Sequence, residues 1–306
     1  MRIAFLGTPE FALPSLSALI ERGYTLCVFT QPDKPVGRKA VLTPPPVKVL
    51  AEQHGIPVYQ FEKIRSFDGC EALVAFQPDL CVTAAFGQLL SKKNLSIPKQ
   101  GTINVHGSLL PKYRGASPIQ SAIINGETHT GVTTMMTDIG MDTGDILLKK
   151  ETAIGLNETY AQLSERLAVL GAELLTETLD RLENGSLIPI PQDESEATCC
   201  HVLTRENGRI DFHKTAKEIH NLVRGTNPWP TAYAYLGDEM LKVYETRLTE
   251  CHDDLLPGSL ISKDDRLFVQ CADDLLEIIS LQMSGKKRMN ADAFLRGCSL
   301  NGKRLC

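Results

Sequence analysis

Short apolar runs that alternate with helical patterns fill the first half of the chain. The runs expected to form buried strands are Ile3–Leu6, Tyr24–Thr30, Leu80–Ala84 and Thr102–Val105. Between the first two runs, Leu16, Leu19 and Ile20 recur at helical spacing, and Gly23 marks the end of that helix. Strands that alternate with helices predict a mostly parallel sheet covered by helices.

The longest helical pattern extends from Glu158 to Asn184. Its apolar residues recur at steps of three and four positions, at Tyr160, Leu163, Leu167, Leu170 and Leu174. Gly185 follows as a stop signal. The stripe lasts too few heptads for a coiled coil, so we predict a helix that packs one face on the core.

The composition changes after Leu187. Pro189, Pro191 and the polar stretch 192–198 are typical of a linker. Beyond it lie short runs with strand character, at Ala232–Leu236, Leu241–Tyr244, Gly258–Ile261, Leu267–Cys271 and Leu275–Ser280. Several short strands at close spacing predict a small β-barrel, similar to the oligonucleotide-binding fold. We therefore expect a first domain at 1–188, a linker at 189–204 and a second domain at 205–306.

Composition and charge narrow the class of protein. With 42% hydrophobic and 23% charged residues, the chain has the make-up of an ordinary globular protein. Its nine cysteines include no C-x-x-C pair and no zinc spacing, which predicts reduced thiols and no metal. The sequence also contains no recognisable leader and no apolar stretch of membrane-spanning length. We expect a cytoplasmic protein without a membrane partner.

The net charge of −5 argues against a general nucleic-acid coat. A local basic footprint remains compatible with that charge, because docking on one defined RNA needs only a patch. The second domain holds equal numbers of acidic and basic residues, with a basic run at Lys286, Lys287 and Arg288. Such a run is more often a solvated face than an RNA contact.

The stretch I-N-V-H-G-S-L-L-P-K-Y-R-G-A-S-P, residues 103–118, holds the most informative chemistry. Asn104 and His106 lie two positions apart on a predicted strand, so both side chains project to the same side. The strand breaks at Gly107, which places them near its C-terminal end, where open α/β sheets bind ligands. Taken alone, a histidine at a strand end is more often structural than catalytic, and an asparagine beside it is usually a turn former.

A second motif, D-I-G-M-D-T-G-D-I at 138–146, supplies carboxylates among glycines. Its glycines can aim Asp142 inward, although such a loop is also typical of a solvated turn. An amide, an imidazole and a carboxylate together suit acyl transfer to an amine. The amide donates to the developing oxyanion, the imidazole moves protons, and the carboxylate orients the imidazole. No nucleophile elbow is evident, which favours direct attack by the amine.

The first glycine turn, F-L-G-T-P-E-F-A, lacks G-x-G-x-x-G and argues against a dehydrogenase.

These motifs resemble the folate-dependent formyltransferases. The run N-V-H-G-S-L-L-P-K-Y-R-G and the later D-x-G-x-D-T-G-D resemble the catalytic core of that group. Four further stretches are similar to the methionyl-tRNA formyltransferase family: F-x-G-T-P-x-F, T-Q-P-D-K-P-V-G-R, N-P-W-P and L-Q-M-S-G-K-K-R-M. The resemblance covers nearly the whole chain.

The resemblance implies both substrates and their sites. The donor would be 10-formyltetrahydrofolate and the acceptor methionine esterified to initiator tRNA. Asn104, His106 and Asp142 would form the catalytic group. The residues implied for the folate pocket are Phe86, Gly87, Ser108, Leu109, Leu110 and Pro111. The first domain would be Rossmann-like, with helices on both faces of its sheet, and the second, a β-barrel, would help to hold the tRNA. We expect a monomer.

The resemblance also implies that the loop Gln31–Lys48 engages the tRNA acceptor arm. The loop carries Lys34, Arg38, Lys39 and Lys48 against the single acid Asp33, a balance that suits phosphate contact. A long surface insertion without function is the alternative. Lys286, Lys287 and Arg288 are a further candidate contact with the tRNA.

Other functions share parts of this pattern. A glycinamide ribonucleotide formyltransferase needs only about one domain, so the second half argues against it. A formyltransferase for a sugar-nucleotide amine and a 10-formyltetrahydrofolate hydrolase have a comparable two-part layout, and the basic loop distinguishes tRNA from these. A non-catalytic tRNA-binding module is the alternative outside enzymes, and turnover of the formyl donor would separate the two.

Overall fold

The computed structural model describes residues 1–37, 39–297, 300 and 302–306, which form two compact units. The first unit contains residues 1–115, 130–152 and 164–199, and the second contains 116–129, 153–163 and 200–306. Both units are therefore assembled from segments that are not contiguous in the sequence. Within the described ranges, no helix combines the length and apolar character needed to cross a membrane.

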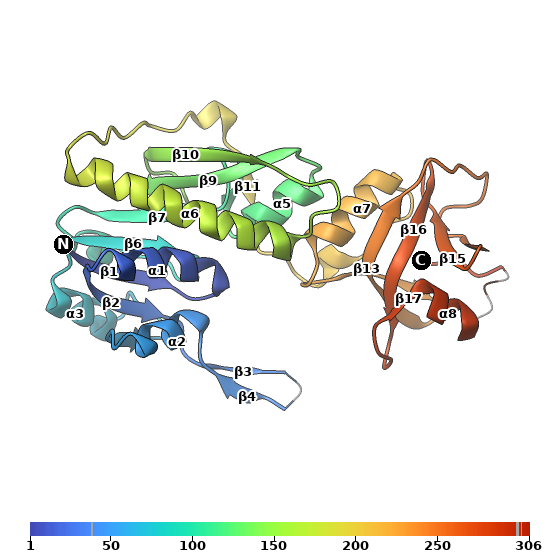
Figure 1. Cartoon of the computed structure of the whole chain (residues 1–306), viewed down its shortest axis with the longest axis horizontal. Coiled ribbons are helices and arrows are strands. Elements are labelled where there is room, and N and C mark those ends of the chain that lie inside the picture. Colours follow the sequence, from blue (N-terminus) through green and yellow to red (C-terminus); the bar gives the residue numbers. More distant parts are fainter. Residues whose placement is uncertain (38, 298–299, 301) are drawn as a thin grey trace. The chain divides into compact units, whose positions relative to one another are not determined.

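A sheet of seven strands, counted over the described residues, organises the first unit (Figure 1). In chain order the strands are β1 (Arg2–Gly7), β2 (Thr25–Thr30), β5 (Val58–Gln60), β6 (Leu80–Ala84), β7 (Thr102–His106), β9 (His129–Met136) and β10 (Ile146–Ala153). Their order across the sheet is β10-β9-β7-β6-β1-β2-β5. The five strands from β7 to β5 run parallel, and β9 runs antiparallel to β7. The prediction of a mostly parallel sheet is confirmed.

Both faces of this sheet are buried. Ile3 and Phe5 pack in one apolar cluster, whereas Ala4 and Leu6 pack in another. Successive side chains of a strand point to opposite faces, so each cluster covers one face of the sheet. This explains why β1 and its neighbours read as continuous apolar runs rather than alternating ones.

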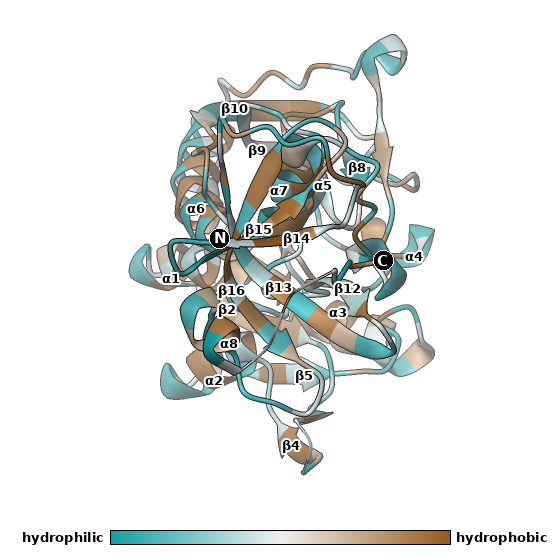
Figure 2. Cartoon of the chain, turned by 90° about the vertical axis from the view of Figure 1, so that its right-hand side faces the viewer, coloured by the Kyte–Doolittle hydropathy of each residue, from teal (hydrophilic) through white to brown (hydrophobic). Residues whose placement is uncertain are grey.

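Helices cover the sheet and join its strands. The helices, within the described part of the chain, are α1 (Leu13–Glu21), α2 (Pro46–Gln53), α3 (Phe67–Phe76), α4 (Lys92–Leu95), α5 (Pro118–Ile124), α6 (Tyr160–Glu183), α7 (Ala216–Gly225) and α8 (Ala291–Gly297), with 3-10 turns at Glu10–Ala12, Glu194–Glu196 and Glu206–Gly208. The helix predicted over 158–184 is α6. Its ribbon shows both brown and teal stretches in Figure 2, and Leu163, Leu167 and Leu175 are fully buried.

The segment expected to be a loop at 31–48 has regular structure. It forms an antiparallel hairpin of β3 (Lys34–Val36) and β4 (Val41–Thr43), and α2 begins at Pro46. Lys48 Nζ binds Asp33 Oδ1 at 2.9 Å and so ties the base of the hairpin together. The prolines and basic residues of this segment concealed its short stretch of strand-forming residues.

A second, antiparallel sheet organises the second unit. Its strands are β12 (Ala232–Leu236), β13 (Glu239–Leu248), β14 (Leu260–Lys263), β15 (Arg266–Gln270), β16 (Leu275–Met283) and β17 (Met289–Asn290). Their order is β12-β13-β16-β15-β14, and β17 pairs with β16. The path is open, but residues near 305 bond to both of its ends, through Leu305 N–H to Gly258 O and Cys306 N–H to Tyr235 O. The expectation of a small β domain after the parallel sheet is confirmed.

Candidate active site

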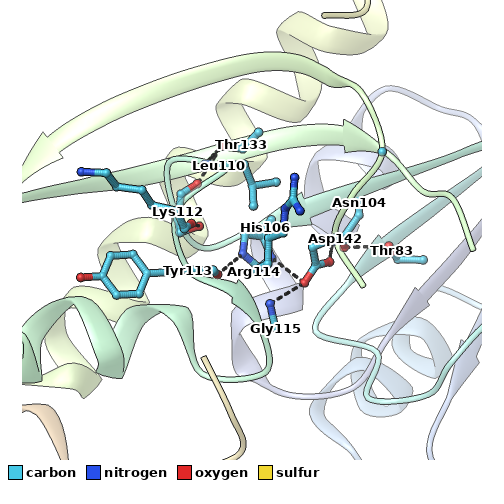
Figure 3. Close-up of polar contacts among 12 residues, drawn as sticks. Thr83, Asn104, His106, Leu110, Lys112, Tyr113, Arg114, Gly115, Thr133 and Asp142 are labelled. Atoms are coloured by element: carbon cyan, nitrogen blue, oxygen red, sulfur yellow. Dashed lines mark hydrogen bonds and ion pairs between the residues drawn. The ribbon is translucent and has the colours of Figure 1, made fainter. Parts of the chain in front are cut away.

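The site lies where β6 and β7 end side by side. The two strands are parallel, and Thr83 on β6 is in register with Asn104 on β7. His106 is the last residue of β7, and its side chain is buried. Parallel strands end at the same edge of a sheet, so the polar groups of both strands meet there (Figure 3).

Asp142 reaches the same place from the loop between β9 and β10. Its Oδ2 accepts a hydrogen bond of 2.8 Å from the backbone N–H of Gly115. Its Oδ1 lies 3.4 Å from Asn104 Nδ2, and Oδ2 lies 3.7 Å from His106 Nδ1. The structure thus brings together the three side chains that the sequence predicted as a group (Figure 3).

The loop that carries Asp142 adopts a backbone path that few residue types permit. Asp142 has a φ of 55°, in the left-handed region that few residues other than glycine adopt. Gly144 has no room for a side chain, because a Cβ there would lie 1.9 Å from the carbonyl oxygen of Met136. The glycines of the D-T-G-D motif therefore permit the loop path that turns Asp142 toward β7.

Hydrogen bonds fix the orientation of both groups on β7. His106 Nε2 lies 2.9 Å from the carbonyl oxygen of Tyr113, which can only accept, so Nε2 carries a proton. Nδ1 faces Oδ2 of Asp142. Thr83 Oγ1 donates to Asn104 Oδ1 at 2.8 Å, which leaves the Asn104 amide N–H groups directed toward Asp142.

Part of the segment expected to be a linker forms hydrogen bonds to the Asp142 loop and to Arg114. We call residues 190–198 the strap. Gln192 Nε2 donates to the carbonyl oxygens of Asp142 and Gly144 at 2.8 and 2.7 Å. Gln192 Oε1 accepts from Arg114 Nε at 3.0 Å, and the other two nitrogens of Arg114 bind both carboxylate oxygens of Glu194 at 2.9 and 2.8 Å. The strap therefore joins the Asp142 loop to the segment that follows β7.

The charges of the strap support this arrangement. The hydrogen bonds to Glu194 raise the pKa of Arg114, and the same contact lowers the pKa of Glu194. The backbone of Thr198 adds a bond, because its carbonyl accepts from the N–H of Arg114 at 2.8 Å. Sequence reasoning missed Thr83, Tyr113, Gln192 and this arginine. A polar stretch between prolines looks the same whether it is solvated or bonded to a catalytic loop.

The residues predicted for the folate pocket follow the same two strands. Phe86 and Gly87 come after β6, where Thr8 Oγ1 and Gln31 Nε2 bond to their carbonyl oxygens at 2.9 Å each. Residues 108–111 come after β7. Ser108 and Leu110 are fully buried, and the N–H of Leu110 bonds to Thr133. Leu109 and Pro111 are half-buried. The two segments thus meet at the edge that holds His106.

The predicted tRNA-binding residues lie on two exposed features. On the β3–β4 hairpin, Lys34 Nζ bonds to Gln31 Oε1 at 2.9 Å, and Lys39 is exposed. Arg38 lies outside the described residues. In the turn before β17, Lys286 and Lys287 are exposed. The guanidinium of Arg288 lies over the ring of Tyr244, 4.6 Å from its centroid.

The donor set of the site is that of a general acid–base centre. No group of three or more His, Cys, Asp or Glu side chains with metal-ligand geometry occurs among the residues that the structure describes. The groups that converge are an amide donor, an imidazole and a carboxylate. Such a set can stabilise an oxyanion and move a proton at one carbonyl carbon.

Comparison with known proteins gives a consistent result over the whole chain. Residues 1–179 match the family model described as formyl transferase, and residues 202–299 match the formyl transferase C-terminal domain. A methionyl-tRNA formyltransferase of Citrifermentans bemidjiense is 51% identical over 302 residues, which cover 98% of this chain and 94% of the relative. One of Ruminiclostridium cellulolyticum is 47% identical, with 97% and 96% covered.

Solved structures share the fold at low identity. An N-formyltransferase from Helicobacter canadensis, in complex with folinic acid and dTDP-3-aminofucose, superposes with a TM-score of 0.71 at 19% identity, covering 94% of this chain and 99% of that one. HypX from Aquifex aeolicus, in complex with tetrahydrofolic acid, gives a TM-score of 0.65 at 16% identity, covering 96% and 47%. At these identities the likeness concerns the fold alone.

Proposed function

Because this chain belongs to the formyl transferase family, we propose that it moves a formyl group from 10-formyltetrahydrofolate to the amino group of methionine on initiator tRNA. The relatives named for this reaction are about half identical and cover nearly the full chain. The observation that carries the chemistry is the convergence of Asn104, His106 and Asp142 at the edge of the sheet.

The proposed reaction needs no covalent intermediate. The amine of methionine attacks the formyl carbon of the donor, and the carbonyl oxygen gains negative charge. An N–H of Asn104 donates to that oxygen. The lone pair on His106 Nδ1 takes the proton that the amine loses, and Asp142 stabilises the charged imidazole beside it. The bond from the formyl carbon to N10 of the folate then breaks, and the proton passes to N10.

The folate donor fits the segments that follow β6 and β7. The half-buried Leu109 and Pro111 offer apolar surface for a flat ring, the buried Phe86 supports the segment after β6, and backbone groups of both segments can recognise the polar edge of the ring. The Gln31 side chain holds the carbonyl oxygen of Gly87 and so fixes one wall. These segments meet beside His106, which would place the formyl group at the catalytic side chains.

We assign the tRNA to the two exposed basic features. Lys34 and Lys39 belong to the β3–β4 hairpin, Arg38 lies between them in the sequence, and Lys286–Arg288 precede β17. The hairpin also exposes Val36, Val41 and Leu42 by more than half, so it offers apolar as well as basic surface. Such a combination suits a nucleic acid whose bases are partly unstacked.

We propose that residues 1–188 form the catalytic domain, residues 189–204 the linker and residues 205–306 the tRNA-binding domain. Because the proposed acceptor is a charged tRNA, we propose that the reaction takes place in the cytoplasm and that the monomer performs it. The connecting segment also positions the site, since Gln192 bonds to the Asp142 loop and Glu194 bonds to Arg114.

The test is direct formylation of charged tRNA. The protein is incubated with 10-formyltetrahydrofolate and methionyl-initiator tRNA, and formyl-methionine is measured after hydrolysis of the ester. A sugar-nucleotide amine serves as the control acceptor, and a reaction without acceptor detects hydrolysis of the donor. Formyl transfer to the sugar amine alone, or release of formate alone, would contradict the proposal.

A further inference from the structure

A polar cavity of about 320 Å³ lies within the second unit. It is lined by residues of the 153–163 segment, by α7 and by strands β13 and β16. Its volume is at the lower end of the range for small-molecule sites. Three arginines line it, at 224, 247 and 288, together with one glutamate, Glu245. The formyl-transfer chemistry proposed above uses none of this space.

Arg224 is the decisive residue of this cavity. Its side chain is almost fully buried, with 6% of the residue exposed. Nε donates to Asn221 Oδ1 at 3.0 Å, and Nη1 donates to the carbonyl oxygens of Gly155 and Glu158 at 3.2 Å each. Across the described chain Nη2 makes no hydrogen bond to the protein, so one edge of the guanidinium is available to a ligand.

The charge of Arg224 has no anionic partner among the residues that the structure describes. Arginine stays protonated even though burial lowers its pKa here. Buried charges are normally paired with an opposite charge, and the carbonyl groups that orient Arg224 carry none. Over residues 1–37, 39–297, 300 and 302–306, no carboxylate lies within ion-pair distance of it. Glu158 acts on it only from farther away, and its carboxylate accepts from the N–H of Gly155 at 2.9 Å.

A second cation faces the same space. Arg288 stacks on Tyr244 and donates from Nε to Ser280 Oγ at 2.8 Å, so its position is fixed, and the residue is exposed. Arg247 lies 3.5 Å from Glu277 and is already paired. The buried His220 contributes no charge, because burial lowers its pKa and both ring nitrogens have partners.

The remaining wall can recognise a nucleoside. Gln162 lines the cavity, and its Oε1 accepts from the N–H and the hydroxyl of Thr159, which leaves its Nε2 without a hydrogen bond to the described residues. Asn227 Nδ2 donates to the carbonyl oxygen of Tyr244 at 2.8 Å, which leaves its Oδ1 to accept. One free donor and one free acceptor beside the cations are the groups needed to bind the edge of a base.

We propose that this cavity is a phosphate-binding site in which Arg224 and Arg288 hold the phosphate of a nucleotide, either in an RNA strand or free. The RNA source rests on the function proposed above, and the free-nucleotide source does not. The first measurement is a calorimetric titration of the full chain with inorganic phosphate at constant ionic strength. We expect saturable binding, weakened at least tenfold by Arg224→Gln and by Arg288→Gln.

Arg296→Gln is the matched control, because Arg296 is exposed on α8 and paired with Asp292 at 2.9 Å. It should bind phosphate like the unaltered protein. Absence of saturable phosphate binding, or equal binding by all three variants, would overturn the site. If Arg224→Gln fails to fold by circular dichroism, Arg288→Gln decides alone, since its side chain is at the exposed rim.

Two further titrations identify the source of the phosphate. If initiator tRNA displaces phosphate and Arg288→Gln raises the KM for tRNA, the phosphate belongs to the RNA. If adenosine monophosphate binds more tightly than inorganic phosphate while the KM for tRNA is unchanged, the ligand is a free nucleotide. Formylation of methionyl-tRNA by the unaltered protein is measured in parallel. Its success without phosphate binding would refute the cavity site and leave the proposed function intact.

Discussion

Replacement of Gln192 by glutamate tests whether the strap positions the catalytic loop. The two side chains have the same shape, and a glutamate at 192 can still accept from Arg114. It cannot donate to the carbonyl oxygens of Asp142 and Gly144, which now receive bonds of 2.8 and 2.7 Å. The substitution therefore removes two donated hydrogen bonds and brings a carboxylate oxygen against the same two carbonyl oxygens, so its effect should be at least that of the two lost bonds.

The size of the effect follows from the loop geometry. Each lost hydrogen bond contributes about 1 kcal/mol, and the left-handed backbone at Asp142 costs about 1–3 kcal/mol to maintain. The two lost hydrogen bonds together contribute about 2 kcal/mol, which is comparable to the energetic cost of the left-handed backbone at Asp142. If this loss appears in the transition state, kcat falls about 30-fold, since 1.36 kcal/mol is a factor of ten in rate.

The assay is steady-state formylation of methionyl-initiator tRNA, with kcat and the KM of each substrate measured separately. We expect the loss in kcat, because Gln192 bonds to the backbone that carries Asp142. Glu194→Gln is the matched control. Glu194 is largely exposed, so its ion pair with Arg114 should contribute little. A folded Gln192→Glu protein with unchanged kcat, or equal losses in both variants, would refute a positioning role for the strap.

Three further predictions concern the site, the hairpin and the second unit. Asn104→Ala, His106→Ala and Asp142→Ala should each lose about 3 kcal/mol of transition-state stabilisation, by analogy with the loss of one oxyanion donor. The loss is measured as a decrease in kcat/KM. Near-normal turnover of all three variants would refute the assignment. Arg38→Ala should raise the KM for tRNA or lower kcat/KM while folate affinity, measured by titration, stays unchanged; a parallel loss of folate affinity would mean that the hairpin acts elsewhere. Glu277 has its pKa lowered by Arg266, so its stabilising effect is complete above the usual carboxyl pKa of 4.5 and disappears as the pH falls through the lowered value. In urea unfolding, the E277Q variant should show a flatter acid limb, and an unchanged slope would argue against the pair.

The sequence was sufficient for the parts of the site that follow strand periodicity. Asn104 and His106 were placed correctly because side chains two positions apart on a strand share a side. The glycines around Asp142 made its inward approach possible without deciding between that approach and a solvated turn, and the structure shows the inward approach. The parallel order of the strands followed from alternating apolar runs and helical patterns, since these patterns reflect burial on both faces.

Other features depend on contacts between residues far apart in the chain. Thr83 looked like any buried strand residue until its partner across the sheet, Asn104, was known. Gln192 lies 50 positions from Asp142, and no local pattern links a polar linker residue to that loop. The hairpin at 34–43 was obscured because its two strands are only three residues each.

The interleaved segments of the two units limit how the chain can be divided experimentally. Helix α5 belongs to the second unit. In the sequence it precedes α6, most of which belongs to the first unit. It packs against α7 so closely that a Cβ at Gly225 would lie 2.6 Å from Ile124. A recombinant fragment ending at residue 188 would leave the apolar side of α5, including the fully buried Ile123, without that cover. Such a fragment should aggregate, and separate expression of the halves is a poor route to assigning their activities.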